Sequence, residues 1–295
     1  MTDNIVRVIK DCCIEISSLI RHGDSESLEH LTSTHNKTGD EVKKLDLISN
    51  EILKEKLIEC DNIRLIGSEE EETLIKTPFE NGRYLVCFDP LDGSSNIGVN
   101  ITVGTIFAIY DLNKNKLNKN TVCGEDIVCA GYCLYGGSTQ FIISHLDGTK
   151  MFTLHHHEFI LSEPSIKIPS SGSIYSVNES NRHKFVDKQM NNLIDYFISH
   201  GKTARWVGSL VADGHRTLLK GGFFAYPGNN THPNGKLRLL YEVLPFAFIF
   251  KISGGKSIPK LTQCVDLDKD IHQKISTVLS SSVEMVQYNK LLCQI

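Results

Sequence analysis

The hydrophobic pattern of the chain alternates between helical and strand-like periods. Apolar residues recur at helical spacing over residues 5–20 and again over residues 42–57, where a capping-box pattern, Thr38-Gly39-Asp40-Glu41, comes first. The apolar run at 84–88 is typical of a strand buried on both faces. The same criteria predict strands at 63–66, 101–110, 127–135, 139–144 and 159–162, and helices at 190–199 and 210–220. This mixed order predicts an α/β protein with layered α/β/α sheets.

The segment 237–252 is apolar almost all round, which predicts a core helix that Pro245 kinks and Gly254-Gly255 ends. Glu242 lies within this segment, and an unpaired buried charge is costly. Glu242 therefore needs a cation, and Arg238 one helical turn earlier is one way to supply it. Arg238 and the nearby Lys236 are also placed to bind phosphate oxygens rather than a carboxylate.

The composition narrows the class of protein only slightly. The 295 residues carry a net charge of −4, so a nucleic-acid partner is not expected. No run approaches the roughly 20 apolar residues that span a membrane, so we expect a cytoplasmic protein without a membrane partner. The nine cysteines show no CxxC or zinc spacing, and we interpret them as reduced thiols. The turn-rich stretch 169–172 predicts a boundary between an N-terminal domain, 1–170, and a C-terminal domain, 171–295.

Two acidic motifs follow predicted strands. Glutamates occupy positions 69–72 after one strand, and Asp89-Pro90-Leu91-Asp92 ends another. Converging carboxylates repel each other unless a divalent cation binds, and hard oxygen ligands suit Mg²⁺. The glutamate run alone is more typical of a solvated loop, whereas two aspartates around a proline after a buried strand indicate a functional site. Gly93-Ser94-Ser95 then offers N–H and hydroxyl groups to an anion, at the expected start of a helix.

Other polar residues leave two interpretations open. Asp40 and Asp46 flank the start of the second predicted helix, and a solvated helix face accounts for them as well as a catalytic role does. Arg205, His215 and Tyr226 are as consistent with structural roles as with functional ones. The histidines at 155–157 lack a further ligand at metal-binding spacing, and we assign them no role.

The motif at 88–97, FDPLDGSSNI, resembles the signature of class I fructose-1,6-bisphosphatases. Further motifs resemble that family in the family's order, at residues 38–46, 68–70, 103–107, 175–179, 205–213 and 233–242. The similarity extends from about Ile5 to the C-terminus. It implies a layered α/β/α sugar-phosphatase fold with two fused mixed-sheet domains, and a homotetramer.

The resemblance also implies a role for each matching residue. The ligands of Mg²⁺, or of Mn²⁺ in its place, would be Glu69, Glu70, Asp89, the Leu91 carbonyl, Asp92 and Glu242. The reacting phosphate would be held by Asp92, Gly93, Ser94, Ser95 and Arg238. The sugar and its distal phosphate would be held by Asn178, Tyr226, Lys236 and an Arg205 from the neighbouring subunit. Water would attack phosphorus in line, and Glu70 with Asp40 or Asp46 would take its proton.

The implied activity is hydrolysis of the 1-phosphate of fructose 1,6-bisphosphate to fructose 6-phosphate, a reaction of gluconeogenesis. Two alternatives stay open: a sedoheptulose-1,7-bisphosphatase and a non-catalytic metabolite sensor or scaffold. Three departures from the family pattern bear on this choice. Gly98 replaces an aspartate that is usual close to the metal site, while Trp206 and Asn181 replace tyrosines of the distal phosphate pocket.

The resemblance further leads us to expect insensitivity to AMP. AMP-sensitive relatives carry an N-terminal extension before the first helix, which here is expected to begin near Ile5. They also carry an arginine in the region of Gly124-Glu125-Asp126, where acidic residues would repel the AMP phosphate. Tyr84, beside Arg83, is the chief remnant of the AMP site.

Overall fold

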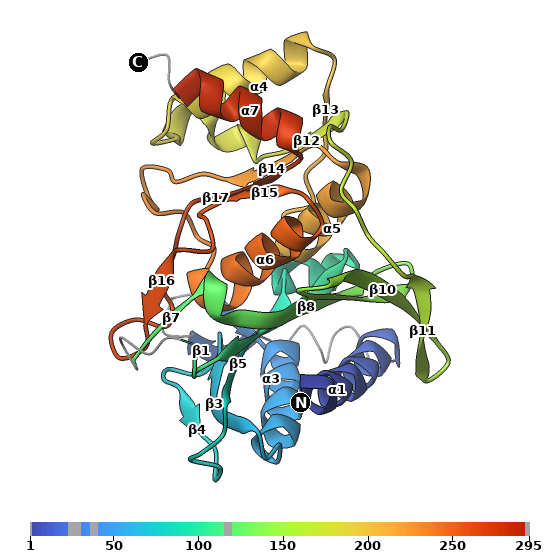
Figure 1. Cartoon of the computed structure of the whole chain (residues 1–295). Coiled ribbons are helices and arrows are strands. Elements are labelled where there is room, and N and C mark those ends of the chain that lie inside the picture. Colours follow the sequence, from blue (N-terminus) through green and yellow to red (C-terminus); the bar gives the residue numbers. More distant parts are fainter. Residues whose placement is uncertain (1, 23–30, 36–40, 115–119, 293–295) are drawn as a thin grey trace.

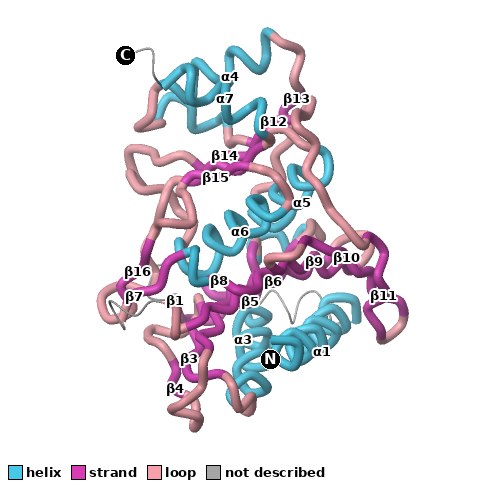
Figure 2. The backbone as a smooth tube through the Cα atoms, in the orientation of Figure 1, coloured by secondary structure: helices cyan, strands magenta, loops and turns pink. Residues whose placement is uncertain are grey.

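The computed structural model describes residues 2–22, 31–35, 41–114 and 120–292. They form five stacked layers, with helices at both outer faces and between two sheets (Figures 1 and 2). From the N-terminal end upward, Figure 1 shows α1 with α3, an eight-stranded sheet, α5 with α6, a five-stranded sheet, and α4 with α7. These helices are α1 (Thr2–His22), α3 (Lys44–Ile58), α4 (Gln189–Ser199), α5 (Leu210–Lys220), α6 (Leu244–Ile252) and α7 (Ser282–Leu292). The predicted layered α/β fold is confirmed.

The eight-stranded sheet has the order β11-β10-β9-β8-β6-β5-β3-β4. Its strands are β3 (Ile63–Ser68), β4 (Ile75–Lys76), β5 (Tyr84–Asp92), β6 (Val103–Asp111), β8 (Ile127–Tyr135), β9 (Thr139–His145), β10 (Gly148–His155) and β11 (Glu158–Glu163). Neighbours pair antiparallel except β3 and β5, which are parallel. Every residue of β5 and β6 is buried, since helices cover both faces at the centre of the sheet. The continuous apolar runs of the sequence reflect this burial.

The five-stranded sheet has the order β13-β12-β14-β17-β15 and is also mixed. Its strands are β12 (Ile174–Ser176), β13 (Thr203–Ala204), β14 (Phe223–Tyr226), β15 (Lys256–Ile258) and β17 (Thr277–Ser280). Two small antiparallel pairs complete the strands, β1 (Leu31–His35) with β2 (Glu41–Lys43) and β7 (Thr121–Cys123) with β16 (Cys264–Asp266). A domain boundary near residue 170 stays a prediction.

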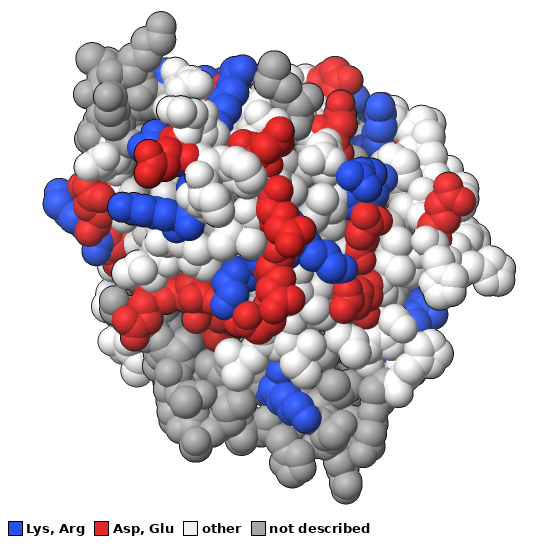
Figure 3. Space-filling view, turned by 90° about the horizontal axis from the view of Figure 1, so that it is seen from below, with Lys and Arg blue, Asp and Glu red and all other residues white. Residues whose placement is uncertain are grey.

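Helices α1 and α3 cover the outer face of the larger sheet. Among the side chains that α1 buries, Ile5, Ile9, Cys12 and Ile16 repeat every three to four residues, as its predicted period requires. Figure 3 shows this end of the molecule, where acidic and basic side chains are interspersed. None of the described helices combines the length and the apolar character needed to cross a membrane.

The predicted core helix 237–252 has two parts. It begins as a π-helical turn, η4 (Leu239–Val243), and continues without a break into α6, with Pro245 in its first turn. Proline lacks the N–H that would bond to the preceding turn, and the wider π turn lies directly before it. The kink at Pro245 stays a prediction. Gly254, with φ of 91°, takes the left-handed conformation just after the helix.

Cys123 and Cys264 form a disulfide that joins β7 to β16. The expectation that the cysteines are reduced is wrong for this pair. The two residues lie 141 positions apart in sequence and meet only because β7 and β16 place them opposite each other, with their Cα atoms 4.0 Å apart. The other described cysteines are buried free thiols.

Candidate active site

Three carboxylates converge where β5 ends against η4. Asp89 and Asp92 lie in the last four residues of β5, Glu242 lies in η4, and one oxygen of each falls within 4.8 Å of the other two. All three are buried. The Leu91 N–H donates to Asp89 Oδ1 at 2.9 Å, which fixes the chain between the two aspartates. The sequence predicted all three as ligands, and the structure brings them together.

The electrostatics of this cluster favour either protons or a cation. Burial raises the pKa of Asp92 to about 6. Burial and then the carboxylates of Glu69, Asp92 and Glu242 raise the pKa of Asp89 well above its ordinary value. Burial likewise raises the pKa of Glu242, although Arg238 opposes the shift. A divalent cation would offset this repulsion, and a donor set made only of oxygens fits Mg²⁺.

The N-terminus of α5 anchors Asp92 from the C-terminal half of the chain. Asp92 Oδ2 accepts hydrogen bonds from Ser209 Oγ and from the Val211 N–H, both at 2.7 Å. Ser209 is also the N-cap of α5. Sequence analysis missed Ser209, because a serine before an amphipathic run signals a helix start but does not reveal a distant partner.

Arg238 lies beside the cluster and contacts two of its acids. Its Nη1 is 2.7 Å from Glu69 Oε1 and 4.0 Å from Glu242 Oε2, and its backbone N–H donates to Glu242 Oε2. The pairing of Arg238 with Glu242 is present, but Glu69 is the closer partner of the guanidinium. The guanidinium of Arg238 contacts carboxylates here, and its predicted contact with a phosphate stays a prediction.

The glutamates at 69–72, which we call the acidic turn, are tied to β5 and to α3. The Glu69 N–H donates to the Phe88 carbonyl in β5 at 3.2 Å. Glu71 Oε1 accepts from Asn50 Nδ2 at 2.9 Å and from Lys54 Nζ at 3.0 Å, both in α3. The turn is thus held in place and is more than a solvated loop. Glu71, to which no role was assigned from the sequence, is an anchor of this turn.

The structure describes two of the three acids that are predicted to accept the proton of the attacking water, namely Asp46 and Glu70. Asp46 is buried in the first turn of α3, one helical turn before Asn50. Asn50 also accepts a hydrogen bond from Ser68 Oγ at 2.7 Å, so this face of α3 adjoins the acidic turn. Glu70 lies within the turn, and its N–H donates to Ser68 Oγ at 3.2 Å. Asp40 lies outside the described residues, and the catalytic roles of all three acids stay predictions.

A small pocket gathers the residues predicted for the sugar side. Asn178, Asn181, Trp206 and Tyr226 all line it, and the rings of Trp206 and Tyr226 have their centroids 6.0 Å apart. Two further predicted residues are not among the pocket's lining. Arg205 is exposed and donates to the Ala204 carbonyl, and Lys236 is exposed as well.

Comparisons with known proteins decide the family. Residues 2–164 match the model described as "Fructose-1-6-bisphosphatase, N-terminal domain", and residues 168–293 match the corresponding C-terminal domain model. The chain belongs to the fructose-1,6-bisphosphatase family. Such enzymes are phosphatases, so the chain is a phosphoric monoester hydrolase.

Individual members of the fructose-1,6-bisphosphatase family match over most of the chain. "Fructose-1,6-bisphosphatase class 1" of Persephonella marina is 42% identical over 85% of this chain and 80% of its own length. "Fructose-1,6-bisphosphatase, cytosolic" of a Saccharum hybrid is 42% identical over 91% of this chain and 82% of its own. The holo-form crystal structure of the Leishmania major fructose-1,6-bisphosphatase has a TM-score of 0.90 at 37% identity, covering 97% of this chain and 93% of that one.

Two glycines follow β5, at positions 93 and 98. Gly93, with φ of 79°, precedes the 3₁₀ helix η1 (Ser94–Val99), and a Cβ there would lie 2.7 Å from that of Ser209. Only glycine fits such a turn without strain. Gly98, where the fructose-1,6-bisphosphatase pattern usually has an aspartate, is exposed in η1 and lines a pocket with Leu45. A glycine has no side-chain ligand, so Gly98 adds none to the cluster of Asp89, Asp92 and Glu242.

Proposed function

We propose that this enzyme is a Mg²⁺-dependent fructose-1,6-bisphosphatase, which releases the 1-phosphate and leaves fructose 6-phosphate. The observation that carries the proposal is the convergence of Asp89, Asp92 and Glu242 within 4.8 Å in a buried site. Acids with strongly raised pKa values are found preferentially at functional sites, where burial and neighbouring like charges shift them. Family membership supports the reaction class.

The chain's own residues supply most of the proposed chemistry. The cation would be held by Asp89, Asp92 and Glu242, with Glu69, Glu70 and the Leu91 carbonyl as further ligands. When bound, it would neutralise the phosphoryl oxygens and the leaving alkoxide. The N–H and hydroxyl groups of residues 93–95 would bind the reacting phosphate, together with Arg238. Glu70, with Asp40 or Asp46, would accept the proton of the attacking water.

The pocket around Trp206 bears on which sugar is hydrolysed. Asn178, Tyr226, Lys236 and Arg205 would bind the sugar and its distal phosphate. Trp206 lines a pocket with Asn178 and Tyr226, where its indole would change the edge that the distal phosphate meets. Sedoheptulose 1,7-bisphosphate is therefore a second candidate substrate, since one more carbon lengthens the molecule toward that edge.

A substrate panel separates these functions. Phosphate release would be measured with fructose 1,6-bisphosphate, sedoheptulose 1,7-bisphosphate and inositol phosphates, each with and without Mg²⁺. We expect Mg²⁺-dependent release and the highest kcat/KM with the fructose compound. A higher kcat/KM with the sedoheptulose compound would favour the second candidate. No release from any of them would leave the non-catalytic sensor or scaffold.

The proposal includes insensitivity to AMP. Arg83 already pairs with Asp111, through contacts of 3.0 Å from Nε and 2.6 Å from Nη2. Glu125 and Asp126 lie in the 3₁₀ helix η2 (Gly124–Asp126), where they would repel a nucleotide phosphate. Each missing charge-assisted hydrogen bond removes about 1.5–3 kcal/mol of binding. Half-maximal inhibition by micromolar AMP at saturating Mg²⁺ would contradict this part of the proposal.

We also propose that the active enzyme is a homotetramer in the cytoplasm. Arg205 is exposed in the single chain, which supports a contact with the distal phosphate of a neighbouring subunit. The cytosolic relative from a Saccharum hybrid supports the location.

A further inference from the structure

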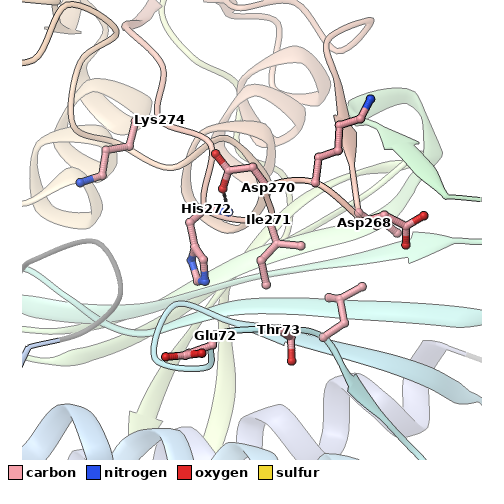
Figure 4. A pocket seen from close by; sticks show the side chains of 10 residues that line it. Glu72, Thr73, Asp268, Asp270, Ile271, His272 and Lys274 are labelled. Atoms are coloured by element: carbon pink, nitrogen blue, oxygen red, sulfur yellow. Dashed lines mark hydrogen bonds between the residues drawn. The ribbon is translucent and has the colours of Figure 1, made fainter.

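His272 links the acidic turn to the helix that carries Glu242. It lies between β16 and β17, in the segment that follows the disulfide strand, and it is 9% exposed. Its Nε2 is 3.0 Å from the Glu71 carbonyl oxygen, and its Nδ1 is 2.5 Å from the Tyr241 hydroxyl. Figure 4 shows the ring pointing from the C-terminal segment toward the loop of Glu72 and Thr73. One side chain thus spans two parts of the chain that both supply predicted ligands.

The two contacts fix the protonation of the ring. A carbonyl oxygen can only accept a hydrogen bond, so Nε2 must carry the proton and donate to Glu71. In the neutral ring, Nδ1 then accepts from the Tyr241 hydroxyl. Tyr241 is fully buried in η4, directly before Glu242. Tyr241 therefore donates to His272, and His272 donates to the Glu71 carbonyl. We call this hydrogen-bonded chain the relay, and each of its polar groups has a partner.

The segment around His272 is itself held against the residues that lead into η4. The Leu239 N–H donates to the Gln273 carbonyl and the Ile275 N–H donates to the Leu237 carbonyl, both at 2.8 Å. The His272 N–H donates to Asp270 Oδ1 at 2.9 Å, as Figure 4 also shows. The ring consequently has little freedom to turn away from the acidic turn.

A second link joins the same two elements, namely the ion pair of Arg238 with Glu69. Under the proposed function, however, Arg238 binds the reacting phosphate, and this would weaken its hold on Glu69. The relay through His272 involves no predicted ligand or phosphate contact. It can therefore hold the acidic turn at a fixed position relative to Glu242 while substrate is bound.

We propose that His272 is a positioning residue for the metal site, which fixes Glu69 and Glu70 relative to Asp89, Asp92 and Glu242 through its hydrogen bonds to Glu71 and Tyr241. The inference rests on the proposed function, because it concerns the metal site named there. Residues that orient metal ligands from outside commonly change metal affinity or activity about 10- to 100-fold when they are replaced.

The test is the affinity for Mn²⁺, measured by the electron paramagnetic resonance of the free ion and so without turnover. We expect His272→Ala to weaken Mn²⁺ binding about tenfold or more. The Mg²⁺ concentration for half-maximal rate should rise in parallel, while KM for fructose 1,6-bisphosphate stays within about twofold, since no substrate contact is removed. His272→Gln keeps one donor and one acceptor on its amide and should restore much of the affinity.

His215 provides a matched control. Its Nδ1 also bonds a tyrosine hydroxyl, that of Tyr132 in β8, at 2.8 Å, and both histidine–tyrosine pairs have ring centroids 5.8 Å apart. His215→Ala should lower thermal stability and leave the affinity for Mn²⁺ within about twofold of wild type. If His215→Ala weakens Mn²⁺ binding as much as His272→Ala does, the effect is general destabilisation and the proposal fails.

Other outcomes are equally decisive. If His272→Ala does not fold by circular dichroism, Tyr241→Phe removes one oxygen from the relay and should still weaken Mn²⁺ binding, about threefold or more. Unchanged affinity in that variant would overturn the proposal. If wild type binds Mn²⁺ and hydrolyses the bisphosphate but a folded His272→Ala variant has unchanged affinity for Mn²⁺, only this inference is refuted. If wild type neither binds Mn²⁺ nor hydrolyses the bisphosphate, the proposed function is refuted instead.

Discussion

At the scale of single residues, Asp92 combines a structural and a proposed catalytic role. Its Oδ2 accepts two hydrogen bonds from the start of α5, while its carboxylate belongs to the three-acid cluster. Asp92→Asn keeps an oxygen for both donors but removes the charge. We expect at least a hundredfold loss of hydrolysis, or about 2.7 kcal/mol of barrier, with unchanged or higher thermal stability in EDTA because repulsion is relieved. Phosphate release within about threefold of wild type would contradict the ligand assignment.

The raised pKa of Asp92 predicts how stability depends on pH. The pKa of Asp92 is about 6 in the folded protein against an ordinary 3.8, so folding favours the protonated carboxyl. Its protonation stabilises the metal-free fold, and this contribution is fully present below pH 3.8. That contribution to stability is lost as the pH rises through about 6. The pKa values of Asp89 and Glu242 are also raised, so their contributions are likewise lost as the pH rises. Mg²⁺ needs the charged carboxylates, so the gain in Tm on adding it should be larger at about pH 8 than at about pH 5. Thermal unfolding at both pH values tests this, and equal gains would contradict it.

The sequence could indicate the acids of the site but not the residues that hold them. Asp89 and Asp92 follow a buried apolar run, and Glu242 interrupts another, so their positions stand out locally. Ser209 and His272 act through partners 117 and 201 positions away, and no local pattern marks them. No local pattern separates Glu71 from the other glutamates of its turn, because its contacts to Asn50, Lys54 and His272 arise only in the fold.

At the scale of elements, the buried carboxylate of Asp213 in α5 organises the loop 205–209. It accepts from the Val207 N–H at 3.1 Å and the Gly208 N–H at 2.9 Å, and it pairs with Arg216. Asp213→Asn turns an N–H₂ group toward these donors. We expect a loss of about 3 kcal/mol in the free energy of unfolding and a raised KM, since the loop carries Arg205 and Trp206. Urea unfolding and steady-state kinetics measure the two effects.

Asp195 gives the matched control for this prediction. Its pairing with Arg182 is close, but its side chain is 64% exposed on α4. Asp195→Asn should change the free energy of unfolding by less than about 1 kcal/mol. Equal losses in the two variants would show that burial of Asp213 does not determine its effect.

Many of the longer elements could be predicted from the sequence because each has its own period, whereas α7 and all strands of the five-stranded sheet were missed. The ranges of β8 and α5 match their predictions at both ends. The π-helical turn before α6 could not be predicted, because a π turn and an α turn bury the same apolar residues at 239–243. The short strands β7 and β16 could not either, since three residues carry too little pattern and their pairing is set by the whole fold.

At the scale of the whole molecule, the proposed sharing of Arg205 between subunits can be tested by complementation. Arg205→Ala should raise KM for the bisphosphate far more than it lowers kcat, because the distal phosphate does not react. In tetramers that mix the two variants, some active sites combine the intact carboxylate cluster of an Arg205→Ala chain with the intact Arg205 of a neighbouring Asp92→Asn chain. At low substrate concentration, co-expressed mixtures should exceed the summed activity of the two parents. Activity equal to that sum would place Arg205 in the site of its own chain.

The proposed function requires the three-carboxylate cluster to support Mg²⁺-dependent hydrolysis of the 1-phosphate of fructose 1,6-bisphosphate. The most direct measurement is ³¹P NMR of that substrate with wild type and with Asp92→Asn, each in Mg²⁺ and in EDTA. We predict that wild type in Mg²⁺ converts the 1-phosphate signal to inorganic phosphate and keeps the 6-phosphate signal, whereas the other three samples remain unchanged. Loss of the 6-phosphate signal first, or equal hydrolysis by Asp92→Asn or in EDTA, would contradict the claim.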